Sequence, residues 1–575
     1  MKKLLTILLY LPMLSAAQVT LDGFVYLENQ TDHNGIKIIF ERTAPSSSTD
    51  SVTTDSSGAF TVQLDAGIYN ITYSKVGFFN WMLYDQIFYN ANTLDTLTLL
   101  ERTTLLNVPS VFPSIQFAID VSSDDDTILV APGTYYENLN LSNKSVFLVS
   151  NFFFNNDTSY IASTIIDGNQ SDDVVIFGVP PWGDSHSANS ILVGFTIKNG
   201  NGDGAISIYH ASPTLSNLII TENFSSYGTI NFNSGFGGGN LLTEANLSNI
   251  TIVNNYGIGN GVGGIYFGKN NSSSLNNITI VNNTGRGTCY FRPQDSQYLI
   301  TLTDSKIIGN TSTGNYEGGG ITNWSGNAIL KNIVIASNTS SGNNNTGGGV
   351  VTYNNIYPNS KLIFNNVTIT NNHVTTNNTS AGGIFFGTTN NSGSNAILKN
   401  SIISSNTGNY GVYVASGNPL INYSDSYNNE NGNFYISNQW LGVNVTTNTN
   451  GDSCDVYYNI QEDPLFVDIV NGDYNLQATS PCIDAGDANS IYNDPDSTIA
   501  DMGCFPYFQM ISGCTDPAAS NYDTAATLDD GSCTYSATCN GDPITGLFID
   551  GIIDDRVTAN FDNMNTYDAS GNQIC

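Results

Sequence analysis

A short β-branched run that ends in asparagine recurs along this chain and limits its fold more than any other feature. Successive copies read, for example, FTIKNG, ITIVNN, SKIIGN, IVIASN and VTITNN. A repeated unit joined by loops of variable length is typical of solenoids, in which each unit packs only on its neighbours. The last asparagine or glycine of the run recurs every 23 to 34 residues, at Gly200, Asn223, Asn255, Asn283, Asn310, Asn338, Asn372 and Asn406.

Each unit contains three short apolar runs, which predict three strands per coil. A Gly-Gly step leads into one run, as at GGIYF (263–267) and GGIFF (382–386), and another run such as NAILKN (395–400) precedes the asparagine phrase. The runs are short, alternate in polarity and are rich in Ile, Val and Thr, which favours strands over helices. Parallel crossovers are almost always right-handed, so the sequence predicts a right-handed parallel β-helix.

The asparagines are expected to serve the backbone. Asparagine tolerates the left-handed region that a sharp corner needs, whereas β-branched residues do not. Amides stacked coil upon coil can also form a hydrogen-bonded ladder. Asn246, Asn249 and Asn277 lie in Asn-Xaa-Ser/Thr motifs. Because the repeat already explains these positions, we interpret them as structural corners and not as glycosylation acceptors.

The segment before the repeats carries a family motif. Residues 114–141 read SIQFAIDVSSDDDTILVAPGTYYENLNL. This start resembles the opening of the pectate-lyase-like superfamily of right-handed β-helices, in which a short capping helix precedes the first coil. The resemblance extends over residues 107–508. Its end, DPLFVDIVNGDYNLQATSPCIDAGD (463–487), resembles the terminal segment of secreted bacterial β-helix proteins that carry varied surface anchors.

The chain is expected to be all-β and modular. Residues 1–17 place two lysines before an apolar stretch, which is typical of a signal peptide. Residues 18–102 predict a β-sandwich, and TTDSSGAFTVQLDAGIYNITYSKVGF resembles the carboxypeptidase regulatory-like (transthyretin-like) domain, with Asp55 and Gly58 in a hairpin turn. The later modules are the parallel β-helix (103–430), its terminal coils and cap (431–508), an Asp-rich loop (512–535) and an incomplete segment that resembles the start of a fibronectin type III domain (538–575).

The Asp-rich loop is too short for a hydrophobic core, so a disulfide or a metal is expected to hold it. We expect Cys514 and Cys533 to form that disulfide. Oxygen-bearing side chains suit Ca²⁺, and they suit plain solvated turns equally well. The loop resembles thrombospondin-type-3-like calcium repeats of bacterial surface proteins. The side chains expected to bind Ca²⁺ are Asp516, Asn521, Asp523, Asp529 and Asp530.

Composition limits the partners and the compartment. The formal charge is −33, from 49 acidic and 16 basic residues, which excludes nucleic acid as a partner because phosphate binding needs clustered cations. No later segment approaches the roughly 20 apolar residues of a membrane helix, so we expect a secreted protein that does not span a membrane. An oxidising compartment favours disulfides, and Cys482–Cys504 is a second expected pair. Cys289 is expected to be a buried free thiol, and Cys454 has no assigned partner.

Strand alternation predicts which side chains of the Gly-Gly run face outward. The inward positions are Ile206, Ile265, Cys289, Ile321, Val350, Ile384 and Val412. The outward positions are Ser207, Tyr266, Tyr290, Thr322, Val351, Phe385 and Tyr413. None of the outward residues is acidic or basic. The paired carboxylates of glycoside hydrolysis are therefore absent from this face, which disfavours catalysis there.

Catalytic candidates remain outside this face. Pectate lyases use an arginine base beside calcium, and this resemblance points to Arg292, with Asp295 and Asp304 in the same coil. For Arg292 we favour the alternative, a solvated charge in a loop. Other titratable residues, which corners or loops also explain, are Asp167, Asp172, Asp173, Asp184 and His186.

The outward row instead favours binding. Tyr266, Tyr290, Phe385 and Tyr413 would stand on coils about 4.8 Å apart, and exposed aromatic rows stack on sugar rings. Loops that cover the row are the alternative. Three functions follow: an exported, adhesin-like protein that binds polysaccharide or another surface without turnover, a polysaccharide lyase or glycoside hydrolase, and a structural stalk.

Overall fold

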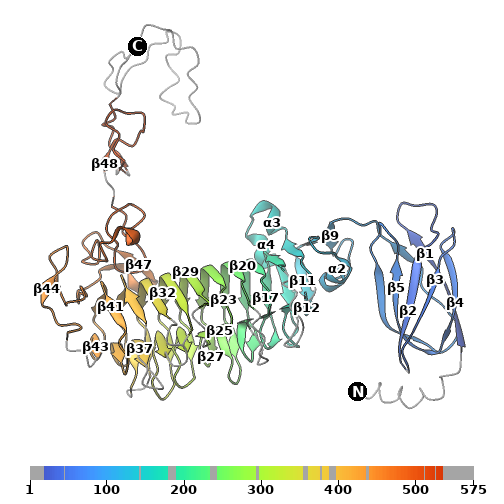
Figure 1. The fold of residues 1–575 in the computed structure, drawn as a ribbon, viewed down its shortest axis with the longest axis horizontal. Helices are drawn as coiled ribbons and strands as arrows, with labels where there is room; N and C mark the ends of the chain where they lie inside the picture. Colours follow the sequence, from blue (N-terminus) through green and yellow to red (C-terminus); the bar gives the residue numbers. More distant parts are fainter. Residues whose placement is uncertain are drawn as a thin grey trace, which may run out of the picture.

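The computed structural model describes residues 18–44, 46–141, 144–178, 189–232, 242–292, 297–324, 326–353, 361–375, 379–387, 396–435, 440–509, 512–524, 526 and 528–534. The expected signal peptide, Asp184, His186, Asp295 and the fibronectin-like segment lie outside these ranges. A small sandwich is followed by a long rod of parallel strands (Figure 1). Within the described ranges, no helix has the length and apolar character needed to cross a bilayer.

Two four-stranded sheets form the N-terminal sandwich. One contains β1 (Gln18–Leu27), β4 (Ala59–Asp65), β7 (Asn92–Thr93) and β8 (Leu97–Leu99), and the other contains β2 (Lys37–Ala44), β3 (Ser48–Thr53), β5 (Gly67–Ser74) and β6 (Trp81–Phe88). Alternate residues of β1 and β5 are buried, as a two-layer core requires. The expected turn is present: Asp55 Oδ1 accepts from the Ala59 N–H at 3.0 Å, and Gly58 has φ +83°.

Aromatic side chains join the sandwich to the rod. Phe79 is 4% exposed and belongs to the core of the rod, where its ring meets Phe112 edge-on at 5.2 Å. Trp81 contacts Phe117 on the capping helix α2 (Ile115–Val121) at 4.5 Å. Arg102 lies over the Phe79 ring. The predicted capping helix is therefore confirmed, and the N-terminal sandwich also packs against it.

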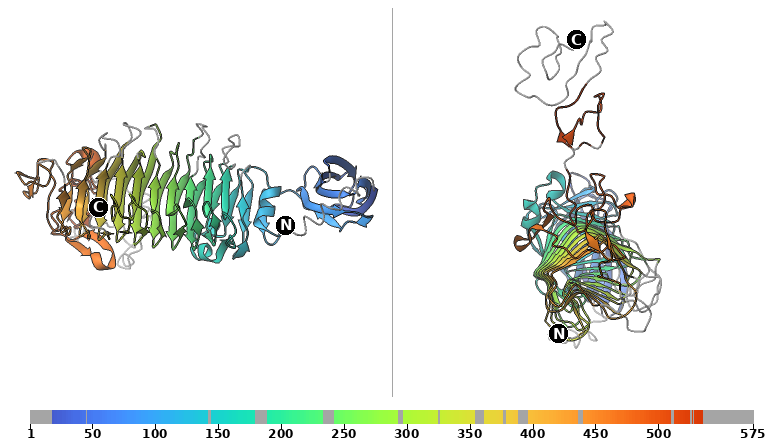
Figure 2. Two further views of the ribbon diagram at one scale, coloured as in Figure 1. Left: turned by 90° about the horizontal axis from the view of Figure 1, so that it is seen from below. Right: turned by 90° about the vertical axis from the view of Figure 1, so that its left-hand side faces the viewer.

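Three parallel sheets form the rod, one strand of each per coil through its central part. The long-strand sheet contains β9 (Leu105–Val108), β10 (Thr127–Val130), β11 (Gly133–Tyr136), β13 (Phe147–Ser150), β14 (Thr164–Asp167), β16 (Ile191–Val193), β17 (Thr196–Lys198), β20 (Thr214–Thr221), β23 (Asn246–Val253), β26 (Ser274–Val281), β29 (Ile300–Ile308), β32 (Ala328–Ala336), β35 (Leu362–Thr370), β38 (Ile397–Lys399), β39 (Ile402–Ser404), β41 (Leu420–Asn422) and β42 (Asp425–Tyr427). The eleven-stranded sheet contains β12 (Leu139–Asn140), β15 (Val175–Gly178), β19 (Ile206–Tyr209), β22 (Gly228–Phe232), β25 (Val262–Phe267), β28 (Cys289–Phe291), β31 (Ile321–Trp324), β34 (Val350–Tyr353), β37 (Ala381–Gly387), β40 (Tyr410–Val414) and β43 (Phe434–Tyr435). The seven-stranded sheet contains β18 (Asn201–Gly202), β21 (Phe224–Ser225), β24 (Tyr256–Gly257), β27 (Thr284–Gly285), β30 (Thr311–Ser312), β33 (Thr339–Ser340) and β36 (His373–Val374). Viewed along the rod, successive coils lie over one another (Figure 2, right), and the predicted parallel β-helix is confirmed.

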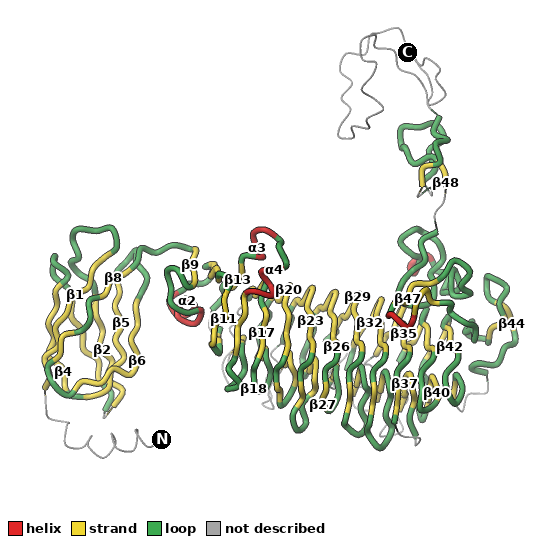
Figure 3. Tube along the Cα trace, turned by 180° about the vertical axis from the view of Figure 1, so that it is seen from behind, coloured by secondary structure: helices red, strands yellow, loops and turns green. Residues whose placement is uncertain are grey.

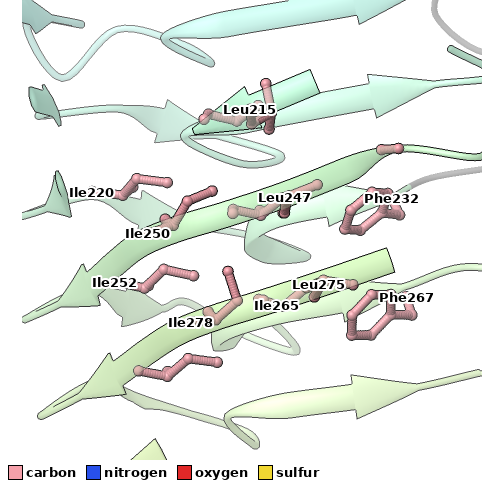
Figure 4. Close-up of a cluster of buried hydrophobic side chains, with 14 of the residues drawn as sticks. Leu215, Ile220, Phe232, Leu247, Ile250, Ile252, Ile265, Phe267, Leu275 and Ile278 are labelled. Atoms are coloured by element: carbon pink, nitrogen blue, oxygen red, sulfur yellow. The ribbon is translucent and has the colours of Figure 1, made fainter. Parts of the chain in front are cut away.

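Stacked aliphatic and aromatic side chains fill the rod. Every inward position predicted for the Gly-Gly run is completely buried, and all of them belong to one continuous core. Phe232, Phe267 and Phe291 stack on three successive coils, with ring centroids 5.2 and 4.7 Å apart. Figure 4 shows the same vertical arrangement for the neighbouring Ile and Leu side chains. Cys289 is a buried free thiol, as expected, and burial raises its pKa.

Two residues of the asparagine phrase have different roles, one in the hydrogen-bonded ladder and one in the left-handed corner. The sequence analysis had assigned both roles to the same residue. The marker asparagines form the ladder: each amide from Asn223 to Asn372 donates to the side-chain oxygen of the next marker. The last marker, Asn406, donates to Asn429 on the following coil. The left-handed residue is instead the one before the marker, such as Asn254 (φ 56°) or Asn282 (φ 55°). A second left-handed corner bends the long strands, at Asn249 and Asn277 among others. Ladder and corner therefore use neighbouring residues, which corrects the expectation.

Two segments cover the outer face of the long-strand sheet near its ends. The short helices α3 (Phe152–Asn155) and α4 (Ser159–Ser163), red in Figure 3, pack on this face through Phe152 and Ile161. The C-terminal cap returns over later coils, and its Cys504 N–H donates to Thr368 Oγ1 at 3.0 Å. Its short elements are β44 (Thr446–Thr447), β45 (Ser453–Cys454), β46 (Phe466–Asp468), a 3₁₀ turn (Ile469–Asn471), β47 (Asp473–Leu476) and a second 3₁₀ turn (Ser490–Tyr492).

The cysteines follow the expectation only in part. Cys514 and Cys533 form a disulfide in the small module that also contains β48 (Ser512–Gly513) and β49 (Leu528–Asp529). Cys482 and Cys504 are both free and buried, so the second expected disulfide is wrong for this structure. Cys482 packs with Ile402 and Met502, whereas Cys504 packs in a different cluster with Val334 and Ala336. Cys454 is also a buried free thiol.

Candidate functional site

The outward residues of the eleven-stranded sheet form a row in the predicted register. Tyr266 pairs with Tyr290 on the next coil, and Phe385 pairs with Tyr413. Their rings stack, with centroids 5.7 and 5.6 Å apart respectively. One further coil extends the row, because Tyr413 pairs with Tyr435 and stacks on it at 4.4 Å. We call this line of outward side chains the aromatic row.

The middle of the aromatic row is buried, which corrects the expectation of an exposed stripe. Val351 and Phe385 are completely buried, and Tyr290 is 8% exposed. Trp324 and Tyr353 pack against this part of the row, with ring centroids 4.8 Å apart. In the middle coils the row is therefore covered, which agrees with the alternative interpretation and not with an exposed binding stripe. Tyr290 and Phe385 cannot stack on a sugar while they are covered.

An acidic side chain lies in this cover. Glu317, which comes just before β31, has a completely buried side chain and accepts from Arg286 Nε at 2.9 Å. Burial raises the pKa of Glu317 to about 7, although Arg286 and the nearby Thr322 and Trp324 favour the charged form. Its Oε2 atom and the Trp324 indole N–H are both buried without a hydrogen-bond partner among the described residues.

A polar stretch occupies the N-terminal end of the same face. Asp173 is 3% exposed, accepts from the Gly204 N–H at 2.8 Å, and has its pKa raised by burial to about 6. The Tyr209 hydroxyl donates to Asp203 Oδ2 at 3.3 Å, and both acidic side chains act on the pKa of this tyrosine, which burial raises. Two carboxyl groups of neighbouring coils thus share one polar region. The sequence interpretation had treated Asp173 as part of a corner.

The C-terminal end of the aromatic row is open. Tyr435 is 47% exposed, whereas Tyr413 beneath it is half-buried. Tyr410 completes the group, at 5.1 Å from Tyr435 and 6.2 Å from Tyr413. We call these three residues the tyrosine platform. It offers an accessible aromatic face that is supported from below, which is the geometry that stacking on a ring requires.

Of the predicted catalytic residues, Arg292 and Asp304 are described, and they lie at different sheets. Arg292 follows β28 in the eleven-stranded sheet, near Tyr266 and Tyr290. Asp304 lies at a left-handed bend of β29 in the long-strand sheet, where Asn276 and Asn332 donate to its carboxylate. Asp295 and the pair Asp184 and His186 lie outside the described residues. Arg292 consequently has no acidic partner from this set in the part of the chain that the structure describes.

The Asp-rich loop uses its oxygens in turns. Asp516, Asp529 and Asp530 each accept from the backbone N–H two residues later, at 2.8 to 3.0 Å. Asn521 bridges to Ser532 and Thr534, and the Asp523 N–H donates to the Cys514 carbonyl. Within the described ranges, no three acidic, histidine or cysteine side chains are arranged to hold a metal. These contacts fit the solvated-turn interpretation, and calcium stays a prediction.

Two functional features were missed at the sequence level. Glu317 stands in NYEGGG, among loop residues whose contact with Arg286 spans 31 positions of the chain. Tyr410 and Tyr435 belong to the last two coils, where the repeat phrase weakens and the register cannot be extended. The alternation in YGVYV predicted Tyr413 as an outward residue, but not which end of the row is open.

A scan of the chain against protein-family models and a search of curated proteins both found no match.

Proposed function

We propose that this chain is an exported, multi-modular protein that binds polysaccharide through the tyrosine platform and does not turn it over. The stacked pair Tyr413 and Tyr435, with Tyr435 half exposed at the end of a rigid rod, is the observation that carries this proposal. Stacking of this kind needs an aromatic face that is already ordered, because an ordered side chain loses little entropy on binding. The parallel strands beneath the platform supply that order.

Several features support export to a cell surface. The Cys514–Cys533 disulfide suits an oxidising compartment, and residues 1–17 have the pattern of a signal peptide. The resemblance to secreted β-helix proteins of the pectate-lyase-like superfamily, and of the flanking modules to carboxypeptidase regulatory-like and calcium-repeat domains, agrees with a surface protein. A charge of −33 favours neutral over strongly acidic glycans, because like charges repel.

The proposal is tested by a glycan array with the full chain and the Tyr435→Ala variant, followed by titration of the best neutral glycan. We expect the variant to lose about tenfold or more in affinity, since each tenfold change corresponds to about 1.4 kcal/mol. Tyr256→Ala is the matched control, because Tyr256 is equally exposed at 47% but lies in a different sheet. Equal loss in both variants, or binding that survives in Tyr435→Ala, would sink the proposal.

A second candidate is acid–base cleavage of a polysaccharide at the polar stretch. Asp173, with its pKa raised to about 6, can donate a proton near neutral pH, and Asp203 on the next coil is the second carboxyl group of this polar region. Separate environments for two carboxyl groups are typical of glycosidases. A reducing-sugar and unsaturated-product assay decides between the two functions. Activity that disappears in both Asp173→Asn and Asp203→Asn would favour the enzyme.

A further inference from the structure

The segment of residues 313–320 connects β30 to β31 and brings Glu317 against Tyr290 and Tyr353 in the middle of the aromatic row. Its neighbours lie on both sides along the rod: the Gly314 N–H donates to the Arg286 carbonyl at 3.1 Å, and the Tyr316 N–H donates to the Asn344 carbonyl at 3.0 Å. The fit is tight, because a Cβ on Gly314 would lie 2.4 Å from the Arg286 oxygen. We call residues 313–320 the cover segment.

Glu317 is the only carboxylate of the cover segment and points inward from it. Its side chain is completely buried, while Arg286, its only ion-pair partner among the described residues, is 38% exposed. One carboxylate oxygen is paired with Arg286, and the other accepts no hydrogen bond from the residues that the structure describes. A half-paired buried carboxylate is costly, whereas the neutral acid is not, so the site favours the protonated form.

The groups that face Glu317 from neighbouring elements are one cation, Arg286, and several neutral side chains. Arg286 comes from the loop after β27, Thr322 and Trp324 from β31, Tyr290 from β28 and Tyr353 from β34. The Tyr353 hydroxyl already donates to the Asn345 carbonyl at 2.8 Å, and Thr322 Oγ1 accepts from the Gly318 N–H at 2.9 Å. Thr322 and Trp324 favour the charged form, but the complete burial of Glu317 outweighs them and Arg286, so the ionised side chain is more stable in water than in this shell.

We propose that the cover segment is a pH-sensitive gate over the middle of the aromatic row, closed while Glu317 is protonated and loosened when Glu317 ionises. The contacts of Glu317 and of the cover segment support this gate. Once uncovered, Tyr290 would bind the same glycan as the platform, an inference that rests on the proposed function.

The direction of the pH effect follows from linkage. Glu317 has a pKa of about 7 in the closed state, against a usual value of 4.5 when it is hydrated. The closed state thus binds the proton more tightly, and its advantage is complete below pH 4.5 and lost as the pH rises to about 7. The opening equilibrium should rise about tenfold per pH unit across this window and then level off.

Hydrogen exchange of the full chain without ligand tests the gate. Rates for peptides covering 313–320 are measured from pH 4.5 to pH 8.5 and corrected for the intrinsic pH dependence of exchange. Wild type should lose protection progressively up to about pH 7, and Glu317→Gln should show no such trend because its amide cannot ionise. Glu244→Gln, at an exposed remote carboxylate, should behave as wild type.

A third variant separates titration of Glu317 from general loosening. Arg286→Gln removes the cation that favours the charged form, so the pH at which protection levels off should move upward. A flat wild-type profile, an unchanged trend in Glu317→Gln, or a levelling point that stays in place in Arg286→Gln would overturn the gate. These outcomes need no glycan, so they are distinguishable from failure of the binding proposal at Tyr435.

Discussion

Asn310 donates to the side-chain oxygen of Asn338 twice, through its backbone N–H at 3.0 Å and its side-chain amide at 2.9 Å. The same amide group donates to the Ile280 and Ile308 carbonyls, so it satisfies backbone groups of its own coil and of the coil below. Both residues are completely buried. Each rung of the ladder is thus a fully bonded polar group within the apolar rod.

Replacing one rung should destabilise the rod strongly. Asn310→Leu removes the acceptor of the buried Asn283 N–H, one of the acceptors of the Asn283 amide, and the amide that donates to the Ile280 and Ile308 carbonyls, at about 1 to 3 kcal/mol for each group that finds no other partner. We expect the free energy of unfolding to fall by about 3 to 5 kcal/mol in chemical denaturation. Asn276→Ala, at an exposed position of the adjoining strand, should change it by less than about 0.5 kcal/mol. Similar values for both variants would contradict the role of the ladder.

The left-handed corner at Asn277 should tolerate glycine but not valine. Its φ is 53°, a region that costs a side chain with a branched Cβ about 1 to 2 kcal/mol. Both Asn277→Gly and Asn277→Val lose the hydrogen bond to Asn249, so their difference isolates the backbone. Thermal or urea unfolding should rank wild type and Asn277→Gly close together and Asn277→Val about 1 to 2 kcal/mol lower. Equal stability of the glycine and valine variants would refute this explanation.

The small module around residues 514–533 should depend on its disulfide for stability, and the stability of the rod should not. Cys514 and Cys533 close a loop of 19 residues, for which loop entropy predicts about 3 kcal/mol of stabilisation. The Cys514→Ser/Cys533→Ser double variant should be cut within 514–533 by a low concentration of protease, while the melting temperature of the rod stays unchanged. Resistance of the double variant to cleavage would show that contacts other than the bridge hold this loop.

The joint between sandwich and rod should be cooperative. Phe79 comes from the sandwich side and is buried in the core of the rod, so Phe79→Ala should cost about 3 to 5 kcal/mol of coupling and separate the two calorimetric transitions. Val76→Ala is the matched control, because Val76 lies in the same loop and is 98% exposed. A single unchanged transition in Phe79→Ala would mean that the domains are not coupled through this contact.

The β-helix and its inward face could be predicted because both follow from local rules. Ile265, Ile321 and Ile384 alternate with outward residues over one strand each, and a period of two fixes their direction. The pairing of Tyr266 with Tyr290 follows from the same register. The corner was misplaced by one residue, because both residues of an Asn-Asn pair suit a left-handed bend equally well until the ladder selects one.

Exposure and long-range contacts could not be predicted in the same way. Whether Phe385 faces water depends on Trp324 and Tyr353, which come from other coils. The cysteine error has a similar origin, since the cap turns between Cys482 and Cys504 and places them in separate clusters. Short spacing in the sequence suggested a bond that the path of the chain does not make.

Hydroxyl-radical footprinting of the full chain, with and without its best-bound glycan, tests the tyrosine platform most directly. At pH 5, where the cover segment is closed, Tyr435 should react readily without ligand and become protected when the glycan is added. Tyr256 should react equally in both samples, and Tyr290 in neither. A glycan that protects Tyr256 but leaves Tyr435 reactive would contradict the platform as the binding site.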